Sequence, residues 1–384
     1  MCDPLYYLNL HKDSLLNTYT ELHALAEPSW QEKYTSDYIK KKLSAAGYHV
    51  RTYAGHYGLT TDLPGKSQKV IALRADMDAL LQEKNGKIIA NHSCGHDAHS
   101  TMVLYTALAL IQNRVKLDHT VRFIFQPAEE KAEGASCMKK EGVLENVSFL
   151  AGIHLRPAFE VPFQKASPVI SHGSTAALRG TIRGLQAHAS RPEEGNNPIE
   201  AASLLIQALQ SIRLKEKGRY SLKITSIQSG ESSNIIPETA RFNFDLRAET
   251  NDIMQRLLTK AKSIILNIAE LTESDISFEI EGYSPAAVFN ASAVDTASKA
   301  IAHVLGEDNV VPDCVSPGAE DFHYYTLDNP GLAATMIGLG CDLKPGLHHP
   351  DMSFQPDALL YGAKILSKLM LLADKQALGE ESAG

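Results

Sequence analysis

The chain has 384 residues, a length that predicts two or three domains, and its 44% hydrophobic and 21% charged residues exclude disordered, collagen-like and low-complexity proteins. The net charge of -8 argues against nucleic acid or an anionic membrane as the main partner. With no long apolar run, no secretion signal and five widely spaced cysteines, we expect a cytoplasmic protein without a disulfide framework.

The first part of the chain alternates between helical and strand patterns. Residues 5–47 carry the apolar stripe of two helices. Three short apolar runs have the composition of buried strands: 70–73, 121–125 and 149–153. Helical patterns lie between these runs, at 98–111 and 134–141. This alternation predicts an α/β fold in which helices flank a sheet.

The pattern changes at about residue 178. Six predicted elements then follow in the order β-α-β-β-α-β, at residues 177–184, 198–214, 222–227, 240–247, 253–271 and 276–280. That order is typical of a ferredoxin-like α+β unit. After Pro285 the first pattern resumes, at 291–305, 333–338 and 358–372. We therefore predict a catalytic domain over residues 1–175 and 286–384, interrupted by an inserted domain over 176–285, and a disordered tail at 379–384.

Polar residues gather where each predicted core strand ends, which is where open α/β sheets bind their ligands. They are Asp76 and Asp78, Glu129 and Glu130, His154, and His348 with His349. In the adjacent pair Glu129 and Glu130, one carboxylate can bind a metal while the other acts as a general base. Each group alone is more often a solvated turn or a packed histidine than a functional site, so their shared position carries the argument.

The densest set of metal-ligating residue types is Asn91-His-Ser-Cys-Gly-His-Asp-Ala-His99. Cys94 and His96, with a glycine between them, suit a first-row metal such as zinc. The alternative is a polar helix N-terminus in which Asp97 or Ser93 is the cap and Cys94 is a small buried residue. On this motif alone, the two interpretations are about equally supported.

A series of motifs runs in order along nearly the whole chain: Arg74-Ala-Asp-Met-Asp-Ala-Leu80, Cys94-Gly-His-Asp-Ala-His99, Gln126-Pro-Ala-Glu-Glu130, Gly152-Ile-His154, His188-Ala-Ser-Arg-Pro192, Asn234-Ile-Ile-Pro237, Gly318-Ala-Glu-Asp-Phe322 and Leu347-His348. Together they resemble the aminoacylase/carboxypeptidase clan of dinuclear metallohydrolases. More narrowly, the chain is similar to the amidohydrolase branch that contains hippurate hydrolases, indole-3-acetyl-amino-acid hydrolases and N-acetyldiaminopimelate deacetylases. Glu27-Pro-Ser-Trp-Gln-Glu32 is also similar to the opening helices of that branch.

The resemblance implies a zinc-exopeptidase-like catalytic domain with a mixed sheet, and an inserted lid or dimerisation domain. Glu129 matches the catalytic base, and Asp78 matches the acid that orients a metal-site histidine. The matching metal ligands are Cys94, His96, Glu130, His154 and His348. Because His348 and His349 stand in tandem, the sequence does not decide which of them is the ligand. Leu81 replaces the proline usual in the branch, and the link from there to Cys94 is shortened.

In the inserted domain, the resemblance implies three substrate-binding residues. His188 matches a histidine that polarises the scissile carbonyl, often across a dimer. Asn234 and Arg247 match positions that hold the carboxylate of the substrate. For Arg247, a salt bridge within a strand is an equally good interpretation. Because His188 lies outside the core domain, we expect a homodimer formed through the inserted domain.

The expected function is metal-dependent hydrolysis of the amide bond of N-acyl amino acids, with neither nucleic acid nor membrane as a partner. Glu129 would take a proton from water and pass it to the leaving amine, while one or two divalent ions and His188 stabilise the oxyanion. A thiolate ligand favours zinc, cobalt, nickel or manganese over magnesium. The sequence does not identify the acyl group, the amino acid or the native metal.

Three alternatives remain open at this stage. The same site could serve a dipeptidase or a peptidase of the aminobenzoyl-glutamate type. Cys94 could be a nucleophile activated by His96 or His154, although the surplus of carboxylates counts against this hypothesis. The fold could also be a metal-dependent binding module without turnover, although Glu129 and the matched ligands are all present.

Overall fold

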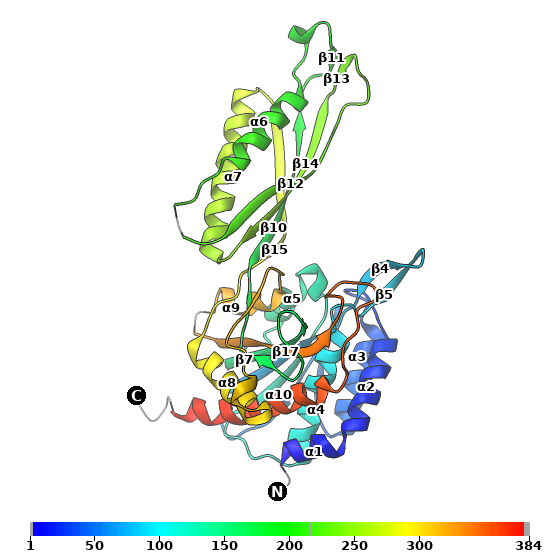
Figure 1. Cartoon of the computed structure of the whole chain (residues 1–384), viewed down its shortest axis with the longest axis vertical. Helices are drawn as coiled ribbons and strands as arrows, with labels where there is room; N and C mark the ends of the chain where they lie inside the picture. Colours follow the sequence, from blue (N-terminus) through cyan, green and yellow to red (C-terminus); the bar gives the residue numbers. More distant parts are fainter. Residues whose placement is uncertain (1–2, 216, 330, 380–384) are drawn as a thin grey trace. The chain divides into compact units, whose positions relative to one another are not determined.

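The structure is a computed structural model of the chain and describes residues 3–215, 217–329 and 331–379. The chain forms two compact units (Figure 1). Unit 1 comprises Met1–Ser171, Val288–Ser316 and Asp321–Gly384, and unit 2 comprises His172–Ala287 and Pro317–Glu320. Beyond Gly379, the tail predicted to be disordered lies outside the described residues.

Unit 1 is built on a seven-stranded mixed sheet, which confirms the predicted fold class. In spatial order its strands are β1 (Val50–Tyr53), β2 (His56–Leu63), β6 (Thr120–Gln126), β3 (Val70–Asp76), β7 (Val147–Pro157), β17 (Ala333–Leu343) and β8 (Ala166–Ser167). The central strands β6, β3, β7 and β17 are parallel, and β1, β2 and β8 are antiparallel to their neighbours. The segments that follow the parallel strands therefore meet at one edge of the sheet.

Helices cover both faces of this sheet. Ile71 and Leu73 on β3 pack into one core and Ala72 packs into the opposite core, which explains why this strand is a continuous apolar run. The larger core is completed by α1 (Pro4–Leu10), α2 (Lys12–Ala24), α3 (Lys33–Ala45), α4 (His96–Gln112), α8 (Ala291–Leu305) and α10 (Ala358–Gly379). The smaller core is completed by α5 (Gly134–Lys140) and α9 (Tyr324–Leu327).

Several elements of unit 1 were not predicted from the sequence. Residues 5–47 contain three helices rather than two, because the first helical stretch is interrupted at His11. Strands β1 and β2 were missed, as was the hairpin of β4 (Leu80–Lys84) and β5 (Lys87–Asn91). The hairpin turn is Asn85-Gly86, with φ of 54° and 75°, as a tight type I′ turn requires. Its strands carry charged residues, so they lack an apolar run.

Unit 2 has the predicted ferredoxin-like order of elements: β10 (Ser174–Arg183), α6 (Pro198–Gln210), β12 (Tyr220–Ser229), β14 (Thr239–Ala248), α7 (Asn251–Leu271) and β15 (Asp275–Ser284). The strands form an antiparallel sheet in the order β12-β14-β10-β15, and the two helices bury a separate core against it. A two-stranded ribbon of β11 (Ala187–His188) and β13 (Ile235–Ile236) extends from the end of the sheet at which β14 begins (Figure 1).

The remaining elements are short. Strands β9 (Ile170–His172) and β16 (Cys314–Ser316) pair with each other. Single turns of 3₁₀ helix occur at Glu129–Lys131, Pro192–Glu194, Glu307–Asn309 and Asp321–His323. Among the described helices, none combines the length and the apolar composition that a membrane-spanning segment requires.

Candidate active site

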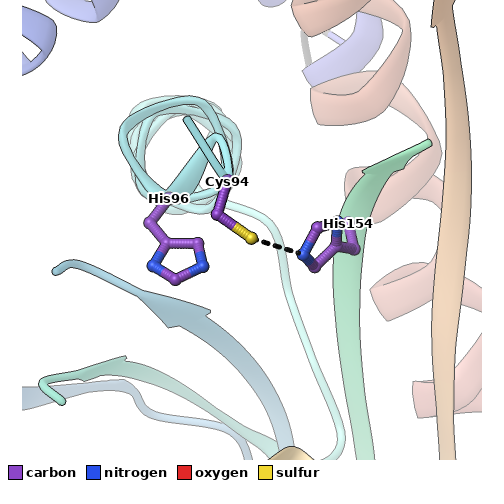
Figure 2. Close-up of side chains that lie close together, drawn as sticks. All are labelled: Cys94, His96 and His154. Carbon is purple, nitrogen blue, oxygen red and sulfur yellow. Dashed lines mark hydrogen bonds between the residues drawn. The ribbon is translucent and has the colours of Figure 1, made fainter. Parts of the chain in front are cut away.

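The predicted metal ligands gather at the edge of the unit 1 sheet where the parallel strands end. Cys94 and His96 lie at the N-terminus of α4, and His154 lies on β7 (Figure 2). The sulfur of Cys94 is 3.5 Å from Nε2 of His154. Glu130 follows β6, and His348 comes from the loop after β17. Ligand atoms lie within 4.8 Å of one another in the group Cys94, His96 and His154 and in the group Cys94, Glu130 and His348.

Gly95 allows Cys94 and His96 to approach the same point. Its φ is 87°, in the left-handed region that side chains other than glycine rarely adopt. A Cβ atom at this position would also lie 2.9 Å from the side chain of Leu155. The glycine of the Cys-Gly-His motif is therefore required both by the backbone and by packing.

Each of the two buried histidines has its Nδ1 beside an oxygen of another residue, which leaves Nε2 for the cluster. Nδ1 of His96 lies 2.9 Å from the backbone oxygen of Asp78 and 3.2 Å from its Oδ1. Nδ1 of His154 lies 2.7 Å from the backbone oxygen of Leu155. Because oxygens only accept here, Nδ1 of each ring carries a proton, and Nε2 is the nitrogen that could bind a metal.

Two buried polar atoms of the cluster have no hydrogen-bond partner, which indicates whether the cluster fits a metal ion. Nε2 of His96 and Oε1 of Glu130 are both buried without a hydrogen-bond partner, and they lie 3.8 Å apart. Buried polar atoms in proteins nearly always have a partner. A cation between these two atoms would satisfy both, and the combination of sulfur, nitrogen and oxygen donors suits a metal of the zinc type. The residues therefore fit a divalent metal.

The pKa values of the cluster reflect both its burial and its charges. Burial opposes protonation of His96, but the charges of Asp76 and Cys94 outweigh it and raise the pKa of this histidine well above its usual value. Burial raises the pKa of Glu130 to about 7, and burial together with the charge on Glu130 raises the pKa of the Cys94 thiol well above its usual value. Burial lowers the pKa of His154 well below its usual value. His154 is therefore neutral, as a ligand must be, whereas Cys94 needs a nearby cation in order to ionise at neutral pH and Glu130 needs one in order to ionise fully.

Glu129, the predicted base, lies beside this cluster. The residue is 8% exposed, its Oε2 is 3.8 Å from Nε2 of His96, and its Oε1 accepts a hydrogen bond of 3.3 Å from the backbone of Asp321. Asp78 accepts bonds of 3.1 Å from the backbone N–H groups of Glu129 and Glu130, one on each oxygen. Asp78 therefore contacts both His96 and the turn that carries the two glutamates.

Of the two C-terminal histidines, His348 is the one that joins the cluster. Both histidines are exposed, but Nε2 of His348 is 3.7 Å from Oε2 of Glu130, whereas Nδ1 of His349 accepts a bond from the backbone of Asp351. The backbone of His348 is left-handed, with a φ of 62°, and is held on both sides: its N–H donates to Ser93, and its oxygen accepts from Gln82 on the β4–β5 hairpin. The β4–β5 hairpin thus supports the ligand loop.

The sequence analysis missed a buried network behind the cluster. Arg74, which is 1% exposed, donates to Asp76 at 2.6 Å, to Asp321 at 2.7 Å and to Gln126 at 2.8 Å. Asp76 also accepts from Nδ1 of His99 at 2.8 Å. The available signal was an arginine inside an otherwise apolar strand, because a buried guanidinium requires acidic partners.

The three predicted substrate-binding residues all lie in unit 2, and the structure separates them into two groups. His188 pairs with Ile235 across the ribbon, so Asn234 is its neighbour, and Ala189 donates to the backbone oxygen of Asn234 at 2.9 Å. The ribbon joins the sheet at the start of β14, and Arg247 lies eight residues further along this strand. Eight residues of a strand span about 26 Å. All three side chains are exposed.

The local partners of the unit 2 residues differ. The Arg247 guanidinium forms two bonds of 3.0 Å with the carboxylate of Asp245 and a longer one of 3.4 Å with the backbone oxygen of Pro317. Nδ1 of His188 accepts bonds from the backbone N–H and the hydroxyl of Ser190, at 3.1 and 2.8 Å. In the single chain, Arg247 therefore forms a salt bridge within its strand, as one of the two interpretations expected.

The sequence matches known proteins over most of its length. The model of peptidase family M20/M25/M40 matches residues 72–372. An N-acetylcysteine deacetylase from Bacillus subtilis strain 168 is 31% identical over 372 residues, covering 93% of this chain and 96% of the relative. A hippurate hydrolase from Campylobacter jejuni is 30% identical over 378 residues, covering 91% of this chain and 94% of the relative.

The fold is also similar to a solved structure. A Bacillus subtilis protein described as a dinuclear metal-binding peptidase of the M20 family superimposes with a TM-score of 0.81 and is 28% identical in sequence, covering 96% of this chain and 99% of that one. The resemblance found in the motifs is therefore confirmed for both sequence and fold.

Proposed function

We propose N-acyl amino acids as the substrates of this chain, which belongs to peptidase family M20/M25/M40 and is a metal-dependent amidohydrolase. The observation that carries the proposal is the convergence of unpaired ligand atoms from His96 and Glu130 next to the buried carboxylate of Glu129. The relatives named above are a deacetylase of N-acetylcysteine and a hydrolase of hippurate, both of which are N-acyl amino acids.

The metal ligands in this proposal are Cys94, His96, Glu130, His154 and His348. When bound, one or two divalent ions supply a Lewis acid for the scissile carbonyl and lower the pKa of water. The thiolate and imidazole donors favour manganese, zinc, cobalt or nickel. Asp78 fixes the tautomer and the orientation of His96 through the contacts at Nδ1.

Glu129 is the general base of the proposed reaction. Its carboxylate accepts a proton from the attacking water and returns it to the nitrogen of the leaving amine. The bond from the Asp321 backbone orients one of its oxygens, and burial excludes bulk water that would compete for the proton. Cys94 is not the nucleophile in this scheme, because its raised pKa keeps the thiol protonated unless a cation lies nearby.

His188 contributes a hydrogen-bond donor. Because Ser190 donates to Nδ1, the proton of the neutral ring lies on Nε2, which can donate to the oxyanion that develops on the substrate carbonyl. Asn234 lies beside His188 and offers an amide to the substrate carboxylate. Arg247 offers a guanidinium fork to the same group once its pairing with Asp245 is loosened.

The positions of these residues support the proposal of a homodimer through the inserted domain. About 26 Å along β14 separates the ribbon, which carries His188 and Asn234, from Arg247. This distance is longer than a small N-acyl amino acid. If all three contact one substrate, the ribbon and Arg247 come from different copies of the chain. The cytoplasmic location expected from the sequence remains a prediction.

The proposal is tested by hydrolysis of N-acetyl, N-benzoyl and indole-acetyl amino acids by the purified protein. We expect release of the free amino acid, its loss with a chelator, and its recovery with added manganese, cobalt or zinc. Dipeptides in the same assay separate this function from that of a dipeptidase. Turnover that resists complete metal removal, or turnover of dipeptides alone, would contradict the proposal.

A further inference from the structure

Glu32 is a fully buried acid near the active site to which the sequence analysis assigned no role. It lies at the end of the loop between α2 and α3. Its Oε1 accepts a hydrogen bond from the backbone N–H of Trp30 and another from that of Ala128, each 2.9 Å long. One carboxylate oxygen therefore joins the N-terminal loop to the turn that leads into Glu129.

Both residues that donate to Glu32 have unusual backbone conformations. The φ of Trp30 is 69° and that of Ala128 is 53°, in the left-handed region that L-residues avoid because Cβ approaches the carbonyl oxygen. Such conformations persist where the surrounding contacts enforce them. The bond to Glu32 is one such contact for each of the two residues.

The turn is held at successive positions by two acids. Ala128 donates to Glu32, while Glu129 and Glu130 donate to the two oxygens of Asp78. Three consecutive N–H groups are thus bound by carboxylates from two other segments. The two acids are themselves connected, because Ser29, in the same loop as Glu32, donates to Asp78 at 2.7 Å.

We propose that Glu32 is a positioning residue that fixes the backbone of Ala128 and thereby the orientation of the Glu129 carboxylate. The inference rests on the proposed role of Glu129 as the base. If the bond is lost, Ala128 can leave the left-handed region, and a rotation of its backbone redirects the residue that follows. Small misplacements of a catalytic group reduce the rate strongly without removing the group.

Glu32 acts in this proposal through an acceptor oxygen and not through its charge. Burial raises the pKa of Glu32 to about 7, and its second oxygen, Oε2, is buried without a hydrogen-bond partner. A glutamine has the same shape and retains one acceptor oxygen for the two N–H groups. A glutamine at this position should therefore keep the turn in place, whereas an alanine should not.

The experiment compares Glu32→Ala and Glu32→Gln with Glu27→Ala as a matched control. Glu27 lies in the same loop, but its carboxylate accepts from Tyr34 and Thr35 at the start of α3. We expect Glu32→Ala to lower kcat by about 10- to 100-fold with KM and bound metal unchanged, and Glu32→Gln to stay within about threefold of the wild type. Glu27→Ala should lower the unfolding temperature without lowering kcat.

A second measurement does not depend on turnover. Amide hydrogen exchange in a peptide covering 127–134 should be faster in Glu32→Ala than in the wild type, and unchanged in Glu32→Gln and Glu27→Ala. In Glu27→Ala, the faster exchange should instead appear at the start of α3. If Glu32→Ala does not fold, the inference is judged by Glu32→Gln, which must retain both wild-type exchange in 127–134 and wild-type kcat.

Three results would overturn the inference: unchanged exchange of 127–134 in Glu32→Ala, equal loss of kcat in Glu32→Ala and Glu32→Gln, or a loss of kcat that follows the loss of bound metal. Failure of the proposed function is recognised separately. In that case the wild type hydrolyses none of the N-acyl amino acids, while the exchange experiment still shows whether Glu32 holds the turn.

Discussion

In unit 1, His96 is fully buried and Glu129 is 8% exposed, whereas in unit 2 His188, Asn234 and Arg247 are all exposed. The buried pair is oriented by residues distant in the sequence, such as Asp78 and Asp321. The side-chain bonds of the exposed residues are mostly local: Ser190 with His188, Ser232 with Asn234 and Asp245 with Arg247.

This difference indicates how much of a catalytic site each unit completes alone. The two buried histidines of unit 1 are pre-organised, because the Nδ1 atoms of His96 and His154 are each held by an oxygen of another residue. The unit 2 residues have no such fixed environment and would acquire one on contact with substrate and a second copy of the chain. In the proposed function, unit 1 would therefore carry the metal and the base, and unit 2 would carry substrate recognition that depends on assembly.

The largest expected effect separates the two adjacent glutamates of unit 1. Glu129→Gln should lower kcat by about 10²- to 10⁴-fold with bound metal unchanged, because the general base is lost and the ligands are kept. Glu130→Gln should lose metal instead. Kinetics together with elemental analysis distinguish the two outcomes. Loss of metal in Glu129→Gln would show that both glutamates are ligands.

The next effect tests whether the unit 2 residues act across a dimer. His188→Ala should lower kcat by about 10²-fold, because it removes a donor to the developing oxyanion. Co-expression of His188→Ala with Glu129→Gln should restore about a quarter of the wild-type activity, because half of the dimers are mixed and each mixed dimer has one site with both residues intact. Absence of recovery would place both residues in the same copy.

A smaller effect concerns Arg247. Arg247→Ala should raise KM for N-acyl amino acids about tenfold, with little change for the corresponding amides, because the charged hydrogen bond to the carboxylate is lost. Arg179→Ala is the matched control, since Arg179 is an exposed arginine of the same sheet that pairs with Glu281. Equal KM changes for acids and amides would favour the salt-bridge interpretation.

The smallest effect is the pH dependence of unit 1 stability. Burial, followed by the charge of Arg74, lowers the pKa of His323 to about 3. Between pH 6.5 and 3 the unfolded chain binds the proton and the folded chain does not, so stability falls as the pH falls. When the pH is lowered from 7.5 to 5.8, the free energy of unfolding of the wild type should fall by about 1 kcal/mol more than that of His323→Asn.

The stability measurement can be assigned to one unit. Trp30 is the single tryptophan of the chain and lies in unit 1, so its fluorescence during urea unfolding reports on that unit. His303→Asn serves as the control, because His303 is exposed on α8. An equal change in the pH dependence of the two variants would exclude burial of His323 as the cause.

The sequence was sufficient to predict the α/β fold class and the gathering of ligands at one edge of the sheet. Both follow from apolar runs that end in acids or histidines, as in Val70–Asp76, and strand ends of a parallel sheet must meet. Strands β1 and β2 and the β4–β5 hairpin were missed because polar or charged residues interrupt or flank each of them and none carries a long apolar run. Their pairing partners, not their own composition, make them strands.

Contacts between distant segments could not be derived from local patterns. The choice of His348 over His349 depends on the left-handed backbone that Ser93 and Gln82 hold in place. The bond between Glu32 and Ala128 joins residues 96 positions apart in the chain. No periodicity or spacing encodes such a pair, because it exists only once the sheet has brought the two loops together.

The insertion of unit 2 into unit 1 affects the order in which a ribosome can complete the protein. Strand β7 ends at Pro157, but its parallel neighbour β17 begins only at Ala333. While the intervening residues are synthesised, the inserted ferredoxin-like unit can fold first, and β7 remains an unpaired edge in a growing chain. Nascent chains that stall before β17 therefore expose a long apolar strand, and such chains are the expected substrates of chaperones.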